Sequence, residues 1–155
     1  MKTIIVGIGN SLFSDDGVGL LVAQTLKSEY LDDQTTVIEA LVDGLDILEL
    51  ITGFEKVIAI DAIKTGENEP GTIYRFDINQ VQSPEKAYPH EINFITSLKL
   101  YRKLGWALPN EIIVFGIEVQ NVDDLNQPCT SKVIAAIPAC VEQIMNELRI
   151  STVGS

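Results

Sequence analysis

Short apolar runs of strand length alternate along this chain with longer stretches in which apolar residues recur at helical spacing. The short runs are rich in β-branched residues, as buried strands are; strands are expected over 3–8, 36–41, 56–63, 72–77 and 111–117. The longer stretches predict helices over 17–27, 45–51, 90–104 and 130–148. Alternating strands and helices indicate an α/β fold with a largely parallel sheet between two layers of helices.

The pattern contains no break that would divide the chain into two units. A chain of 155 residues can bury one substantial core and is short for two. No internal repeat, low-complexity segment or linker interrupts it. We therefore expect a single three-layer α/β domain over residues 1–150, followed by a frayed tail over 151–155.

The charge balance disfavours two classes of binding partner. The chain has 11 basic and 22 acidic residues, a formal net charge of −11. Nucleic acids and anionic membranes both require a basic face, so neither is an expected partner. The start lacks the long apolar region of a signal peptide, and no run approaches the roughly 20 residues of a membrane span. A cytoplasmic location is expected, with Cys129 and Cys140 as reduced packing residues.

The glycine-rich stretch over 7–19 invites comparison with dinucleotide-binding loops. That fingerprint requires a third glycine where this chain has Leu12. A phosphate would also be repelled by Asp15 and Asp16 at the expected start of the helix. A nucleotide site is therefore disfavoured. Instead, one aspartate is expected to cap the helix and the other to point toward the carboxyl edge of the sheet.

Three candidate ligands, Asp16, Asp61 and His90, are expected at that edge. Asp61 ends a buried strand, where a carboxylate is costly unless it is paired, bound to a metal or used as a turn cap. His90 is the only histidine, and a lone histidine is more often a packing or surface residue than a ligand. Ligands of open α/β sheets collect at the carboxyl ends of the strands. Two oxygens and one imidazole nitrogen suit a borderline divalent ion with positions left open.

Several short motifs resemble those of the hydrogenase maturation proteases and follow one another in the same order. These are the endopeptidases that finish the large subunit of nickel–iron hydrogenases. The matching stretches are Gly7 to Gly19, Ile60-Asp61-Ala62, Pro70-Gly71-Thr72, Pro89-His90 and Phe115-Gly116-Ile117-Glu118. The resemblance implies a twisted, mostly parallel five-stranded sheet with helices on both faces. It also implies that the strand over 72–77 is the one that runs antiparallel.

The resemblance further implies a metal-binding trio, which falls by matching motifs on Asp16, Asp61 and His90. In the family this trio recognises nickel already installed in the large-subunit precursor, before a C-terminal extension is cut off. Nickel would thus arrive with the substrate, and zinc or cadmium would be substitutes in vitro. The resemblance names no catalytic residue beyond this set and no further cofactor. It implies a monomer.

One loop departs from the family pattern. An aspartate followed by Gly-Gly-Thr is common after the second strand, whereas residues 39–46 here keep only Gly44 clearly. Asp43 or Asp46 could replace the lost polar group. The favoured hypothesis is a nickel-dependent processing endopeptidase. Two alternatives stay open: a nickel-checking protein without proteolytic activity, and a self-contained metallopeptidase with its own tightly bound metal.

Overall fold

The sheet at the centre of the fold has five strands, in the order β2-β1-β3-β5-β4. The computed structural model describes residues 2–10, 13–29, 31–41, 44–78 and 93–153. The strands are β1 (Thr3–Ile8), β2 (Thr35–Ala40), β3 (Lys56–Ile63), β4 (Ile73–Asp77) and β5 (Glu111–Glu118). All neighbouring pairs are parallel except β4 and β5, so the antiparallel strand is the one the resemblance implied.

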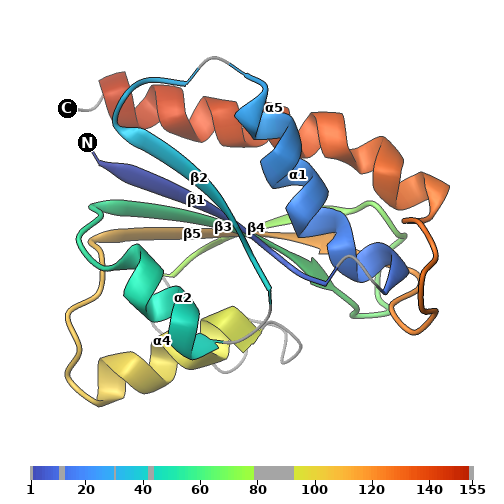
Figure 1. The fold of residues 1–155 in the computed structure, drawn as a ribbon, viewed down its shortest axis with the longest axis horizontal. Helices are drawn as coiled ribbons and strands as arrows, with labels where there is room; N and C mark the ends of the chain where they lie inside the picture. Colours follow the sequence, from blue (N-terminus) through green and yellow to red (C-terminus); the bar gives the residue numbers. More distant parts are fainter. Residues whose placement is uncertain (1, 11–12, 30, 42–43, 79–92, 154–155) are drawn as a thin grey trace.

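Helices cover both faces of the sheet, as Figure 1 shows. They are η1 (Ser14–Gly17, a 3-10 turn), α1 (Val18–Lys27), α2 (Gly44–Ile51), α4 (Asn93–Lys103) and α5 (Ser131–Val153). α1 and α5 lie on one face, and α2 and α4 lie on the other. Side chains of a strand point alternately to the two faces, so Ile58 and Ile60 of β3 pack under α1 and α5. Ala59 and Ile63 pack under α2 and α4. The single three-layer α/β fold is confirmed.

Most of the expected strands and helices match the observed ones to within about a residue at each end. β2 begins at Thr35, one residue earlier than expected. α5 continues to Val153, well past the expected end at 148 and through the first residues of the segment expected to be frayed. The apolar periodicity did not predict η1, which joins β1 to α1. Residues 90–92, the expected start of the fourth helix, lie outside the described part of the chain.

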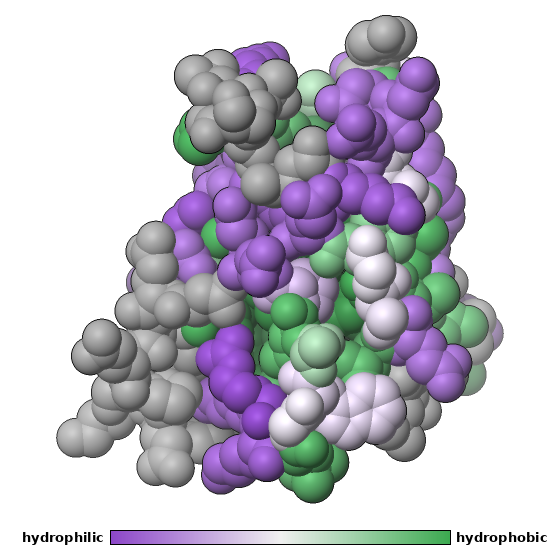
Figure 2. All heavy atoms as spheres, turned by 90° about the vertical axis from the view of Figure 1, so that its left-hand side faces the viewer, coloured by the Kyte–Doolittle hydropathy of each residue, from purple (hydrophilic) through white to green (hydrophobic). Residues whose placement is uncertain are grey.

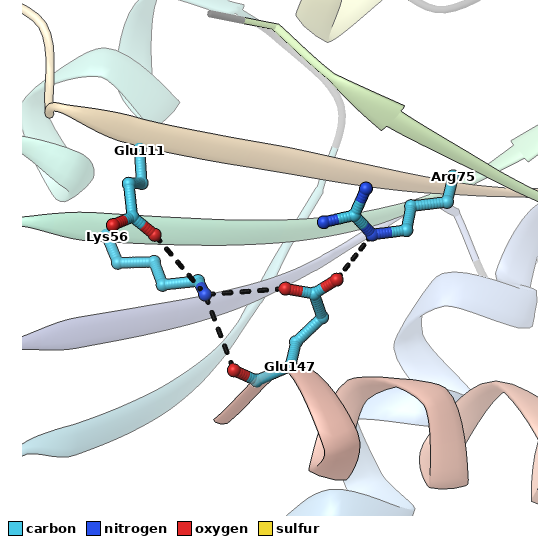
Figure 3. A network of polar contacts seen from close by, with 4 residues as sticks. All are labelled: Lys56, Arg75, Glu111 and Glu147. Carbon is cyan, nitrogen blue, oxygen red and sulfur yellow. Dashed lines mark hydrogen bonds and ion pairs between the residues drawn. The ribbon is translucent and has the colours of Figure 1, made fainter. Parts of the chain in front are cut away.

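An ion network around the buried Lys56 joins α5 to the amino edge of the sheet, where β1, β3 and β5 begin (Figure 3). The side chain of Lys56 is 2% exposed, and its Nζ lies 3.4 Å from carboxylate oxygens of both Glu147 and Glu111. Arg75 Nε pairs with the other oxygen of Glu147. Burial alone would raise the pKa of Glu147, but Arg75 and Lys56 lower it overall. This network fixes the long terminal helix against β3, β4 and β5.

Figure 2 looks onto the amino-edge side, where hydrophilic surface surrounds an apolar area in the lower half, the part occupied by α2 and α4. Exposed apolar side chains of these elements are Leu50 on α2 and Leu100, Leu104 and Trp106 at and just past the end of α4. Asp16 and Asp61 belong to the opposite edge. Within the described residues, no helix combines the length and apolar character needed to cross a bilayer.

Candidate functional site

Two of the predicted ligands lie where the order of strands in the sheet changes direction, between β1 and β3. β2 lies on one side of β1, and β3 and β5 lie on the other. Ligands of open α/β sheets bind outside the carboxyl ends of the strands at such a switch point. Asp16 lies on η1, which follows β1, and Asp61 lies near the end of β3. The connectivity of the fold therefore brings together two residues that are 45 positions apart in the sequence.

The glycines of the first loop allow η1 and α1 to approach the strand ends closely. A Cβ atom on Gly9 would lie 2.2 Å from the carbonyl oxygen of Asp16. A Cβ atom on Gly19 would lie 2.5 Å from the carbonyl oxygens of both Ile8 and Ile60. No side chain fits at either place. The glycine pattern that resembled a nucleotide loop thus serves a backbone contact that seats Asp16 beside β1 and β3.

The negative charge of Asp16 affects the ionisation of Asp61. Asp61 is 9% exposed, and its Oδ1 accepts a hydrogen bond of 2.8 Å from the Ala62 N–H. Burial, and next the charge of Asp16, raise the pKa of Asp61 to about 8 despite that bond. Asp16 is half-buried, and burial raises its pKa too, opposed by a 3.1 Å bond from the Asn10 N–H.

The surroundings of this pair disfavour the state in which both carboxylates are charged. Burial penalises each charged form, and the two negative charges repel each other. A cation bound between them would relieve both effects, because carboxylate oxygens are good ligands for divalent ions. Within the described residues, no three side chains of the metal-ligating types cluster together. Two carboxylates alone are not a complete ligand set, so a cation at this place would need further ligands.

His90, the third predicted ligand, lies outside the described residues. The described part of the chain resumes at Asn93, where α4 begins. This helix packs on the same face as Ala59 and Ile63. Asp61 shares that face, because its side chain alternates with that of Ile60.

The expectation that Asp15 or Asp16 caps α1 is wrong. The N-cap position is Gly17, and no side chain forms a capping hydrogen bond there. Asp15 instead turns away from the helix and is fully buried. Its carboxylate accepts hydrogen bonds from the backbone N–H groups of Asn121 and Thr130, more than a hundred residues away. The sequence contained no signal for these partners.

Glu118 is a buried carboxylate near the site that the sequence reasoning did not assign. It is 1% exposed and accepts 2.8 Å hydrogen bonds from the Thr65 N–H and the Tyr74 hydroxyl. Burial would raise its pKa, but these hydrogen bonds lower it overall. Glu118 thus fixes the turn after β3. An acidic residue directly after an apolar run was the available signal, the same one that identified Asp61.

Glu39, the first residue of the atypical stretch 39–46, lies in β2 and contacts α1. The Glu39 carboxylate is held by α1, with Oε1 2.7 Å from Gln24 Nε2 and Oε2 2.8 Å from Lys27 Nζ. These contacts lower the pKa of Glu39, the Lys27 hydrogen bond most strongly. Asp43 lies outside the described residues, and the position of the Asp46 side chain is not described.

The two cysteines are packing residues, as the sequence predicted. Cys129 and Cys140 are both buried and unpaired with each other. Burial, and next the charge of Asp15, raise the pKa of Cys129 to about 11. Burial raises that of Cys140 to about 12. Neither thiol is therefore ionised to a useful extent at neutral pH, which makes both poor nucleophiles.

The fold and the sequence match one class of peptide-bond hydrolases. The family model for hydrogenase maturation proteases matches residues 20–147, so the chain belongs to that family. It is 26% identical to the hydrogenase 2 maturation protease of Escherichia coli, over 99% of this chain and 94% of that protein. It is 27% identical to the hydrogenase expression/formation protein HupD of Rhizobium leguminosarum, over 96% of this chain and 74% of HupD.

A solved structure from the same family has the same fold over nearly its whole length. The hydrogenase maturating endopeptidase HybD of Escherichia coli superposes with a TM-score of 0.81 at 25% sequence identity. The match covers 97% of this chain and 94% of HybD. The family supports peptidase activity in hydrogenase maturation.

Proposed function

We propose that this protein is the endopeptidase that removes the C-terminal extension of a nickel–iron hydrogenase large-subunit precursor. It recognises the nickel already inserted in that precursor through Asp16, Asp61 and His90. The observation that carries this proposal is the pair of acids at the switch point. Burial and the charge of Asp16 raise the pKa of Asp61 to about 8, which marks a place where a cation would be stabilised.

In this proposal the two aspartates distinguish a nickel-loaded precursor from an empty one. Without a cation, Asp61 is mostly protonated at neutral pH and the pair carries about one negative charge. Binding of the precursor then requires that Asp61 loses its proton, so that both carboxylates can serve as ligands beside the imidazole of His90. An empty precursor offers no compensating charge and is bound weakly.

Cleavage adds one water molecule across the scissile peptide bond. Nickel held at this site would polarise the peptide carbonyl or lower the pKa of a bound water. A carboxylate beside it can accept the proton that the water loses. The buried cysteines, with pKa values of about 11 and about 12, argue against attack by a thiolate. A direct attack of water fits the residues available better than a covalent intermediate does.

The test combines the purified protein with nickel-loaded precursor and, separately, with nickel-free precursor. We expect the nickel-loaded precursor alone to be shortened, with the released C-terminal peptide detected by mass spectrometry. His90→Ala and Asp16→Asn should each lower the cleavage rate at least a hundredfold while the circular dichroism spectrum stays unchanged. Glu39→Gln is the matched control, because that carboxylate contacts α1 instead, and it should cleave at the wild-type rate.

The same assay separates the rival functions. A stable complex with nickel-loaded precursor and no shortened product would identify a nickel-checking protein instead of a protease. Cleavage of nickel-free peptides by a protein that carries stoichiometric metal in elemental analysis would identify a self-contained metallopeptidase. Full cleavage by His90→Ala would refute the assignment of that histidine.

A further inference from the structure

Asp15 has a carboxylate that is completely buried and surrounded by hydrogen-bond donors. Its Oδ2 accepts 2.9 Å bonds from the backbone N–H groups of Gln120 and Asn121. Its Oδ1 accepts a 2.6 Å bond from the Thr130 N–H. The Thr130 hydroxyl lies 3.0 and 2.9 Å from the two oxygens. One side chain of η1 thereby binds both ends of the segment 120–130.

The chemistry of this position favours a carboxylate over any neutral side chain of the same size. A buried charge is costly unless it is well hydrogen-bonded, and these partners of Asp15 are uncharged N–H and O–H groups. An asparagine would direct its NH2 group at one or more of them, since an amide has only one acceptor oxygen. A carboxylate therefore satisfies all of these donors, whereas a neutral side chain would leave at least one of them unpaired.

Ser14 strengthens the same link. Its hydroxyl donates a 2.9 Å bond to the carbonyl oxygen of Pro128, and its own carbonyl oxygen accepts a 3.2 Å bond from the Cys129 thiol. The φ angle of Ser14 is 44°, a left-handed conformation that costs energy for a serine. The turn is therefore held in a strained shape by the segment that contacts it.

Asp16 lies between this anchored turn and the end of β1. The Asn10 N–H bonds to the Asp16 carboxylate at 3.1 Å and approaches its carbonyl oxygen at 3.3 Å. Gly9 lies against the same carbonyl. Asp15 and Ser14 hold the turn from the side of the segment 120–130, while Gly9 and Asn10 hold it from the side of the sheet. The carboxylate of Asp16 has its place beside Asp61 because both contacts exist.

We propose that Asp15 is a positioning residue: it anchors η1 to the segment 120–130 and so holds Asp16 in place beside Asp61. Asp15 does not contact substrate, because its oxygens are already occupied by donors from its own chain. Its effect on cleavage passes through Asp16 and rests on the proposed function. Its effect on the position of Asp16 is independent of the proposed function.

The first test measures amide hydrogen exchange at Asn10, whose N–H reports directly on Asp16. We expect Asp15→Asn to increase the exchange rate of this amide at least tenfold over wild type. Thr130→Val, which removes one donor and keeps the backbone N–H, should produce a smaller change in the same direction and serves if Asp15→Asn does not fold. Glu147→Gln disturbs the network at the opposite edge and should leave Asn10 unchanged. Unchanged exchange at Asn10 in folded Asp15→Asn would overturn the proposal.

The second test measures cleavage of nickel-loaded precursor per folded molecule, with the folded fraction of each variant determined at the assay temperature. We expect Asp15→Asn to be at least tenfold slower than wild type after this correction. Glu147→Gln, also destabilised, should retain the wild-type rate per folded molecule. A loss in Asp15→Asn that its folded fraction fully explains would show a merely structural role. A wild-type protein that cleaves no precursor would refute the proposed function, while the exchange data would still decide the role of Asp15.

Discussion

Asp61 is an acidic residue in a place that disfavours its charged form. A carboxyl group that is 9% exposed and has a pKa of about 8 is held in an environment that disfavours its charged form. The neighbouring aliphatic residues Ile60 and Ile63 show that an apolar side chain is readily accommodated in this part of β3. An acid here lowers the free energy of unfolding at neutral pH, a cost that the proposed binding of a cation would explain.

We predict that Asp61→Asn stabilises the protein above about pH 5 and abolishes precursor cleavage. The pKa of Asp61 is higher in the folded state than the model value of 3.8, so the folded state holds this proton more tightly. The stabilisation that comes from this tighter proton binding is fully present below about pH 4. It is lost as the pH rises toward 8, at about 1.4 kcal/mol of unfolding free energy per pH unit. Asparagine has no such dependence.

The measurement is the thermal midpoint of both proteins between pH 4 and pH 9. The wild-type midpoint should fall relative to that of Asp61→Asn as the pH increases through this window, and the difference should level off above pH 8. Parallel curves would contradict the elevated pKa.

At the scale of elements, the ion network of Lys56 secures α5 to the sheet. Its members contribute unequally, because Lys56 and Glu147 are buried whereas Glu111 is 48% exposed. An exposed ion pair contributes little, whereas a buried charge that loses its partner is costly. Glu147 also pairs with Arg75 and thereby connects α5 to β4.

We predict that Glu147→Gln lowers the free energy of unfolding by about 2 kcal/mol, since it leaves Lys56 with only part of its compensation. Glu111→Gln should lower it by less than about 1 kcal/mol, because the remaining ion pair with Glu147 is intact. Urea denaturation of the two variants gives both values. Equal losses would show that burial does not decide the strength of these pairs.

The apolar pattern predicted the strands well, because strands buried on both faces form continuous apolar runs. β1, β3 and β5 were located within about a residue for this reason. η1 was not predicted, because Ser14–Gly17 has no periodicity and its shape depends on the segment 120–130. The role of Asp15 was missed for the same reason. Long-range contacts of this kind leave no mark in the local sequence.

At the scale of the whole molecule, the two ends of the sheet have different tasks. The amino edge carries the ion network that stabilises α5, and the carboxyl edge carries the acids that the pKa of Asp61 shows to be costly. The topology explains this division, because the switch point between β1 and β3 exists at the carboxyl ends alone. The general location of the candidate site was predictable from the order of strands and helices, whereas the effect of the Asp16 charge on Asp61 required coordinates.

We predict that the effects of Asp61→Asn and Glu147→Gln on stability are additive within about 0.5 kcal/mol, because the two sites share no partner. The double variant should therefore regain part of the stability that Glu147→Gln loses at pH 7.5. Urea denaturation of the four proteins in this cycle measures the coupling. A coupling above about 1 kcal/mol would indicate that the two edges communicate through the sheet.

The burial of Cys129 and Cys140 has a practical consequence. With pKa values of about 11 and about 12, both thiols should resist maleimide reagents at neutral pH. A single cysteine introduced on the surface could then carry a fluorescent dye without removal of the native ones. Labelled in this way on the exposed part of α5, the protein would report its encounter with a precursor in real time.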